Sequence, residues 1–288
     1  MKEFLSEVLL DGLIDVLKLI PFLFIAFLIL EYIEHKMSKK NKDILSKNKK
    51  VGPLVGSLLG AFPQCGFSSL ATNLFSSRVI TLGTLIAVYL STSDEMLPLM
   101  IAEKINLLTI IKIIGTKFII GLIFGYIIDL IYRKHKKDEK IDSHIHDMCH
   151  DHDCHCEDGI FKSSIIHTLK ISLYIFIATI LIGTAIYFIG EDNIKNILKH
   201  GNILTYFLAS FIGLIPNCAS SVIVTELYLN NMISVGTLLS GTLTGAGVGL
   251  LILFKENKNI KENLIIVSII YFVGVLIGFL VDLIGVTL

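Results

Sequence analysis

Long apolar runs separated by short clusters of charge dominate this sequence. A helix needs about 20 apolar residues to cross the hydrocarbon core of a bilayer. Runs of that length occur at 9–33, 79–101, 107–131, 165–189, 233–254 and 264–284. The pattern predicts an all-α, polytopic membrane protein with the lipid bilayer as its surroundings.

Two further apolar segments, 51–75 and 201–229, are each interrupted near the middle by a proline inside a polar patch. The first patch reads Pro63-Gln64-Cys65-Gly66-Phe67-Ser68-Ser69, and the second reads Pro216-Asn217-Cys218-Ala219-Ser220-Ser221. Proline removes a backbone donor and disturbs the preceding helical turn, so each segment is predicted to form two half-helices. The alternative is a pair of kinked helices whose small residues serve packing.

The two interrupted segments belong to an internal repeat. Pro63 and Pro216 lie 153 residues apart, and this offset holds through most of each half. The matched pairs include Gly60 with Gly213, Cys65 with Cys218, Gly83 with Gly236, Gly125 with Gly278 and Asp129 with Asp282. The chain therefore divides into a first membrane repeat at 1–131, a linker at 132–159 and a second membrane repeat at 160–288.

Loop charge predicts that the two repeats are inverted. Cytoplasmic loops carry an excess of Lys and Arg, and these residues crowd both the loop at 34–50 and the start of the linker. Both loops can be cytoplasmic only if 51–75 enters the membrane and returns as a hairpin. Each repeat then has three spans and one re-entrant hairpin, and an odd number of spans inverts the second copy. Lys112 and Lys117 do not fit this scheme, which places them in the outer half of their helix.

Inverted repeats with interrupted helices are a recurring plan of secondary transporters. Non-helical backbone at membrane depth is tolerated only where protein or a wet cavity surrounds it. The exposed N–H and C=O groups of half-helices can replace the hydration of an ion. Two hairpins related by a pseudo-two-fold axis would bring Cys65 toward Cys218. The hairpin residues of the predicted transport site are Pro63, Gln64, Cys65, Ser68, Ser69, Pro216, Asn217, Cys218, Ser220 and Ser221.

Carboxylates within apolar runs add to the predicted transport site, because ionisable groups inside a membrane are costly and mark function. Asp94 and Glu95 lie well inside the run 79–101, on one face if that run is a continuous helix. The second repeat has a glycine-rich stretch, 242–249, at the matching place, which predicts a loosened backbone there. Glu226 is a further candidate. The alternative places Asp94 and Glu95 at the outer interface, in contact with water.

Residues 144–158 of the linker contain five histidines and three cysteines, interleaved with carboxylates. These residues are His144, His146, Cys149, His150, His152, Cys154, His155 and Cys156. Imidazole and thiolate ligands suit zinc, copper, nickel or cobalt, so the linker is predicted to be a cytoplasmic metal-binding tract. Its alternative interpretation is a solvated polar linker.

Composition removes several classes of function. The chain is 53% hydrophobic and 17% charged, whereas soluble domains carry about 25% charged residues. Its formal net charge is zero and gives no electrostatic reason to bind nucleic acid. No segment resembles a Gly-rich phosphate loop with its Lys, so energy would come from the proton gradient, the membrane potential or a separate ATPase. No cofactor is expected beyond transition-metal ions bound as substrate or by the linker.

The Pro-Gln-Cys-Gly-Phe-Ser motif at 63–68, the Pro-Asn-Cys-Ala-Ser-Ser motif at 216–221 and the His-rich linker resemble one family over the whole chain. This family is the ten-helix heavy-metal exporters of bacteria and archaea, which are described as arsenic efflux proteins or manganese transporters. A count of ten implies that each hairpin contributes two helices. The resemblance implies export of a toxic metal or metalloid, and it extends to the six residues Pro63, Gln64, Cys65, Pro216, Asn217 and Cys218.

The preferred hypothesis is a plasma-membrane exporter of a divalent heavy-metal cation, such as manganese or zinc, that works by alternating access. Arsenite efflux is the close alternative, although arsenite prefers three thiolates and the membrane core offers two. An intramembrane enzyme with Cys, Asp and Glu as reacting groups is an alternative from another class. It is disfavoured because no His is expected in the membrane core to act as a base. A metal sensor in which the linker matters most is the third class.

Overall fold

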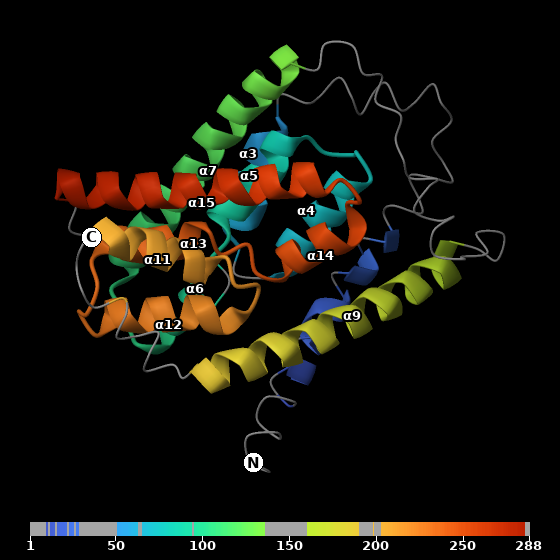
Figure 1. Ribbon diagram of the computed structural model, residues 1–288, viewed down its shortest axis with the longest axis horizontal. Coiled ribbons are helices and arrows are strands. Elements are labelled where there is room, and N and C mark those ends of the chain that lie inside the picture. Colours follow the sequence, from blue (N-terminus) through green and yellow to red (C-terminus); the bar gives the residue numbers. More distant parts are fainter. Residues whose placement is uncertain are drawn as a thin grey trace.

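The computed structural model describes residues 10, 12–14, 16–21, 23–25, 27–28, 51–62, 65–93, 95–135, 160–189, 198 and 203–285. All regular secondary structure in these ranges is α-helical (Figure 1), which confirms the predicted all-α class. The part of the linker that is predicted to bind metal and much of the first predicted span lie outside the described residues.

The same series of five helices occurs in each half of the chain. The first series is α3 (Gly52–Gly60), α4 (Cys65–Ser76), α5 (Leu82–Ser91), α6 (Met96–Ala102) and α7 (Leu107–His135). The second is α11 (Ile203–Gly213), α12 (Cys218–Leu229), α13 (Val235–Leu243), α14 (Val248–Glu256) and α15 (Ile260–Ile284), and α9 (Ile160–Ile189) precedes it. These bounds match at the offset of the sequence repeat.

Both interrupted segments divide into two short helices at the predicted places. Helix α3 ends at Gly60 and α4 begins at Cys65, while α11 ends at Gly213 and α12 begins at Cys218. The 12 residues of α12 extend over about 18 Å, little more than half of the hydrocarbon core of about 30 Å. Each half-helix is therefore too short to span the membrane by itself.

The first interrupted segment folds back as a hairpin. Gly52 lies against Thr84 and Gly60 against Ser91, so α3 runs beside α5 in the same direction. The short connection 77–81 then returns α4 to the start of α5. In the second half, Ser210 donates to the backbone oxygen of Ser240, and Gly213 lies against Gly241 farther along both helices. Helices α11 and α13 are therefore parallel in the same way.

Two spans that the apolar pattern predicts as continuous helices are broken, and Glu95 lies in the first break, not on a continuous helix. Helix α5 ends at Ser91 and α6 begins at Met96; α13 ends at Leu243 and α14 begins at Val248. Gly247 permits the second break, because its φ of 52° lies in a region that side chains disfavour. The helix is interrupted at 244–247, within the stretch 242–249 where a loosened backbone is predicted, and a matching break occurs in the first half.

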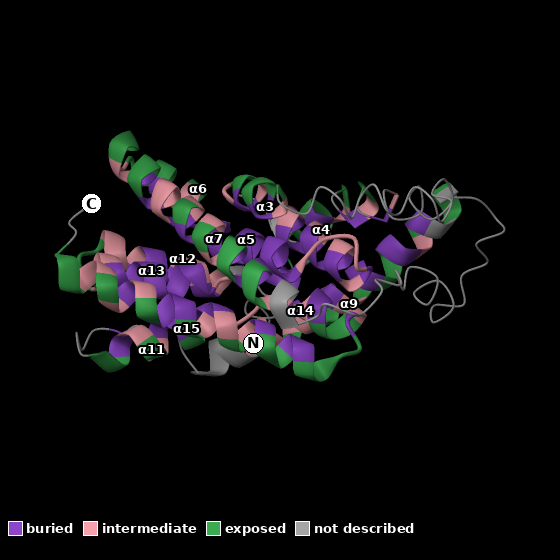
Figure 2. Cartoon of the chain, turned by 90° about the horizontal axis from the view of Figure 1, so that it is seen from above, coloured by how far each residue is buried: buried purple, intermediate pink, exposed green. Residues whose placement is uncertain are grey.

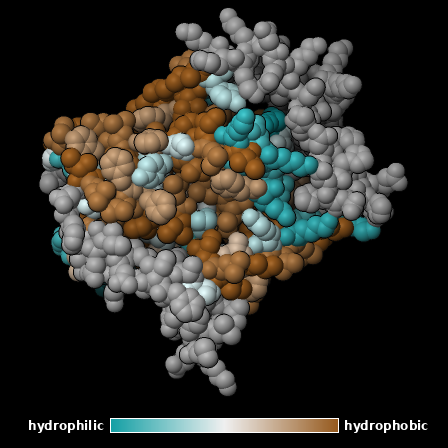
Figure 3. Space-filling model, in the orientation of Figure 1, coloured by the Kyte–Doolittle hydropathy of each residue, from teal (hydrophilic) through white to brown (hydrophobic). Residues whose placement is uncertain are grey.

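The broken helices form the centre of the molecule and the long helices form its periphery. Each candidate membrane span contains an apolar window of 18 residues, and the buried share of that window differs between spans (Figure 2). It is 83% in Val235–Glu256 and 65% in Leu82–Ala102, but only 28% in Leu107–Tyr132 and 33% in Ile260–Ile284. The outer faces of these long helices are apolar, and Figure 3 shows this surface over α15 and its neighbours. An apolar exterior around a buried, interrupted interior suits a bilayer, where lipid contacts the continuous helices.

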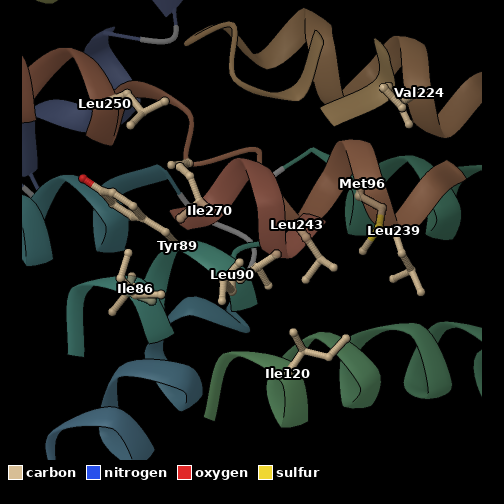
Figure 4. Packing of buried hydrophobic residues seen from close by; sticks show 14 of the residues in the cluster. Ile86, Tyr89, Leu90, Met96, Ile120, Val224, Leu239, Leu243, Leu250 and Ile270 are labelled. Carbon is tan, nitrogen blue, oxygen red and sulfur yellow. The ribbon is translucent and has the colours of Figure 1, made fainter. Parts of the chain in front are cut away.

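The two halves interlock through their half-helices. Helix α4 of the first half packs against α14 of the second, and α12 packs against α6. One hydrophobic cluster draws residues from both halves, including Tyr89 and Leu90 of α5 and Leu243 of α13 (Figure 4). The halves therefore share a core and are not separate folding units.

An aspartate, buried in the first half and half-buried in the second, fixes the N-terminal end of the central helix in each half. The Asp129 carboxylate of α7 accepts from Gly83 N at 2.9 Å and from Thr81 Oγ1 at 2.8 Å. The Asp282 carboxylate of α15 accepts from Gly236 N at 2.8 Å and also from the Ser234 hydroxyl. Carboxylates at helix N-termini satisfy free N–H groups and the helix dipole. The matched Gly and Asp residues of the repeat therefore serve this structural role.

Candidate functional site

The tip of each hairpin lies against the break of the neighbouring helix. Ser93 Oγ, in the break between α5 and α6, donates to the backbone oxygen of Ala61 at the tip of the first hairpin, at 2.9 Å. In the second half, Gly213 at the end of α11 packs tightly against the Thr244 side chain, in the break between α13 and α14. Each half thus places two interruptions of its helical backbone side by side.

A buried lysine connects the breaks of the two halves. The Lys117 ammonium donates to the backbone oxygen of Thr92, and also to that of Thr242 at 3.0 Å. Thr92 directly follows α5, and Thr242 lies in the last turn of α13. Lys117 is only 1% exposed. The C-terminal ends of two half-helices, one from each half, therefore converge on one point in the core.

The predicted hairpin residues of the first half are described in part. Pro63 and Gln64 lie outside the described residues. Cys65 and Cys218 are the first residues of α4 and α12, although their side chains are not described.

In the second hairpin, polar side chains shape the turn. Pro216 lies half-buried in this turn. The side chain of Asn217 accepts from Ala219 N at 3.0 Å and thereby caps α12. Ser220 Oγ donates to the backbone oxygen of Asn217 at 2.8 Å, while Ser221 is half-buried on α12. Asn217 and Ser220 thus have structural roles alongside the predicted binding role.

Helix α4 carries a buried polar face toward the second half. Ser68, Ser69, Thr72 and Asn73 are each at most 1% exposed. Thr72 Oγ1 and Tyr89 OH lie 2.6 Å apart, and Tyr89 OH also donates to the Gly249 carbonyl at 3.2 Å. The Asn73 amide donates to the Ser69 carbonyl at 3.1 Å, while its side-chain oxygen is buried without a hydrogen-bond partner.

The predicted carboxylates are distributed over three places. Asp94 lies outside the described residues, and Glu95 is half-buried at the residue that precedes α6. Glu226 is half-buried on α12, a helix that contacts α6. Among the described side chains, no group of three or more His, Cys, Asp or Glu residues is placed to hold a metal ion.

A second polar cluster lies where α7 ends and α15 begins. Arg78 forms a bidentate ion pair with Glu262, with N–O distances of 2.9 and 2.7 Å. Tyr132 OH and the Asn257 amide donate to the same carboxylate at 3.2 and 3.0 Å. This cluster joins the turn before α5 to the connection between α14 and α15.

A cavity of about 410 Å³ adjoins the second aspartate cap, and Tyr206, Ser234 and Asp282 are among the residues that line it. Tyr206 OH donates to Asp282 at 2.8 Å. The Tyr206 and Ser234 hydroxyls of this cavity thus both donate hydrogen bonds to the Asp282 carboxylate at the N-terminal end of α13.

Sequence reasoning missed Lys117, Tyr89 and His167 as residues of the interior. Lys117 gave a signal, because its charge did not fit the loop pattern. His167 is 5% exposed on α9 and stacks on Phe27, with ring centroids 5.3 Å apart. The expectation that no His lies in the membrane core is therefore wrong, since His167 falls within the candidate span Ser164–Thr184.

The fold and site together define a class: a polytopic, all-helical membrane protein whose halves meet at interrupted helices around a polar centre. The chain belongs to the family described as "Putative, 10TM heavy-metal exporter", whose sequence profile matches residues 1–191 and 160–287. This match confirms the resemblance seen in the two Pro-polar-Cys motifs and the linker. No curated protein and no solved structure matches the chain.

Proposed function

We propose that this protein exports a divalent heavy-metal cation, such as Mn²⁺ or Zn²⁺, from the cytosol across the plasma membrane by alternating access. One observation carries the proposal: carbonyl oxygens at the ends of α5 and α13 meet at one buried point, where both bind the Lys117 ammonium. The C-terminal ends of helices attract cations. Neutral arsenous acid would gain little from this charge distribution, which favours a cation over a metalloid.

The proposed ligands come from the hairpin tips and the adjacent break. Cys65 and Cys218 would bind the metal as thiolates. Asp94, Glu95 and Glu226 would ligate the ion or carry counter-transported protons. The polar lining would comprise Pro63, Gln64, Ser68, Ser69, Pro216, Asn217, Ser220 and Ser221. The hydrogen bond from Ser93 to Ala61 supports this grouping, since it joins the residue before Asp94 to a residue two positions before Pro63.

The two repeats are proposed to be inverted in the membrane, with the His/Cys linker in the cytosol. Support comes from Tyr132 at the C-terminal end of α7, which binds Glu262 at the N-terminal start of α15. These helices are equivalent in the repeat, so opposite ends of equivalent helices lie together. The linker would bind metal ions before or during transport, and its thiolates and imidazoles are suitable ligands.

The test is the metal content of cells that express the protein, measured by elemental analysis across manganese, zinc, nickel, cobalt, copper and arsenite. The expected result is a fall in one divalent metal that the Cys65→Ser/Cys218→Ser variant reverses. A matched control replaces the three linker cysteines with serine, which removes thiols outside the membrane and should leave export in place. A fall in arsenic alone would instead identify a metalloid exporter. No change in any element would contradict the export function.

A further inference from the structure

Lys117 is a buried cation in the middle of the proposed cation site. It is among the largest side chains that are almost fully buried. An ammonium group has three donors and no acceptor, and backbone oxygens of Thr92 and Thr242 accept two of its hydrogen bonds. A charged lysine at this depth is costly unless such partners compensate for its lost hydration.

Both partners are carbonyl groups at the ends of half-helices. The last carbonyls of a helix lack intrahelical partners and carry the negative end of the helix dipole. Two such ends from different halves create a position with negative potential, and the lysine ammonium occupies it. A metal ion that used the same oxygens could not share them with an ammonium, because two cations at that distance repel each other.

The repeat supplies this lysine from one half only. The residue that matches Lys117 in the second half is Ile270, which is 0% exposed in the shared core. Lys117 nevertheless donates to carbonyl groups of both halves. The two helix ends, one from each half, are thus held by one ammonium group.

We infer that Lys117 is a tethered cation that occupies the transport site between loads, and that the exported ion must displace it. This inference rests on the proposed function and identifies the specificity-determining residue of the same site. The electrostatic interaction of a monovalent ion with the carbonyl groups of Thr92 and Thr242 is no stronger than that of the lysine ammonium. A divalent ion gains more, so the lysine selects divalent over monovalent cations, and its return to the site drives the ion out.

The experiment uses full-length protein in proteoliposomes and measures KM and kcat for Mn²⁺ transport. The decisive variant is Lys117→Gln, which keeps amide donors for the carbonyl groups but removes the charge. Loss of the internal competitor should lower KM about tenfold or more, since a charge at hydrogen-bond distance in a protein interior exceeds that effect. It should also lower kcat, because the bound ion leaves slowly when no lysine replaces it.

Two further variants separate the role of charge from that of packing. Lys117→Arg keeps the charge and adds donors, so the guanidinium should be harder to displace and KM should rise. Lys112→Met removes an exposed charge on the same helix and should leave both constants unchanged. An unchanged KM in Lys117→Gln, with or without a fall in kcat, would assign the lysine a structural role and overturn the inference. If neutral variants do not fold, a KM for Lys117→Arg at or below the wild-type value overturns it.

A binding measurement keeps the two proposals distinct. Mn²⁺ binding to purified full-length protein can be followed by loss of the free-ion EPR signal. Mn²⁺ binding to the linker is the same in both proteins and therefore cancels when Lys117→Gln is compared with the wild type. If the wild type transports none of the tested ions but Lys117→Gln binds Mn²⁺ more tightly than wild type, the export function fails and the lysine competition stands. Equal affinities overturn the competition.

Discussion

The contact between α5 and α7 at Gly83 gives the sharpest prediction about stability. A Cβ atom at Gly83 would lie 2.6 Å from Asp129 Cγ and closer still to the backbone oxygen of Gly125. Carbon atoms in contact prefer separations of about 3.5–4.0 Å, so Gly83→Ala must push the two helices apart by about 1 Å. The same displacement weakens the hydrogen bond from Gly83 N to Asp129, which is 2.9 Å long.

The expected cost combines two effects. Overpacking of this kind costs about 1–3 kcal/mol, and loss of a carboxylate cap costs about 0.5–2 kcal/mol. Gly83→Ala should therefore reduce the free energy of unfolding by about 1.5–5 kcal/mol. The matched control is Gly115→Ala on α7, where no atom lies within 4 Å of the added Cβ. That change should be neutral or stabilising by up to about 1 kcal/mol, because alanine favours the helix.

The chain has no tryptophan, so far-UV circular dichroism during SDS titration of detergent-solubilised protein is the suitable assay. The midpoint for Gly83→Ala should shift to lower SDS, while that for Gly115→Ala should stay or rise. If both variants unfold within about 0.5 kcal/mol of the wild type, the range of neutral surface changes, the tight helix contact is not an energetic feature of the protein. Gly236→Ala tests the same reasoning in the second half.

Three further predictions concern other parts of the chain. Arg78→Met should reduce the free energy of unfolding by about 2 kcal/mol. This is less than for a fully buried ion pair, because the Arg78 side chain is 29% exposed. Adding Glu262→Gln in a double-mutant cycle should recover part of that loss, because it removes the carboxylate charge left without its partner. Tyr89→Phe should cost about 1–3 kcal/mol in the SDS assay, since it leaves the buried Gly249 carbonyl without this donor; an unchanged midpoint would contradict that role. Deleting 141–158 should preserve export while changing its dependence on metal concentration, and complete loss of function would favour a sensor.

The apolar runs and the repeat predicted most of the fold because each depends on local sequence. Proline inside a polar patch is a strong local signal, and the half-helices begin at Cys65 and Cys218 as that signal implies. The break after α5 was harder to predict, since 79–101 is apolar enough to form a helix. Its interruption depends on tertiary contacts, such as the bond from Ser93 to Ala61. A hydrophobicity pattern contains no information about such partners.

The candidate site shows the same limit. The sequence indicated which side chains are costly in a membrane, but it could not assign their partners. In the sequence, Lys117 stands out only because its charge does not fit the topology that the loop charges predict. The structure places it between carbonyl groups from the two halves of the chain. Asp129 and Asp282 were recognised as matched residues, and the structure assigns them to helix capping. Burial and hydrogen bonding, which decide between a ligand and a cap, arise only from three-dimensional packing.

The paired aspartate caps have a mechanical consequence. Helices α5 and α13 are held at their N-terminal ends by Asp129 and Asp282, and at their C-terminal ends by the Lys117 ammonium. The 10 residues of α5 form a lever of about 15 Å. A pivot of about 10° at the clamped end moves the far end by about 2.6 Å over that length, enough to break a hydrogen bond at Thr92. If α5 and α13 pivot at their capped N-terminal ends, their C-terminal carbonyl groups separate and come together again around the central site. The outer helices need not move in the lipid for this to happen.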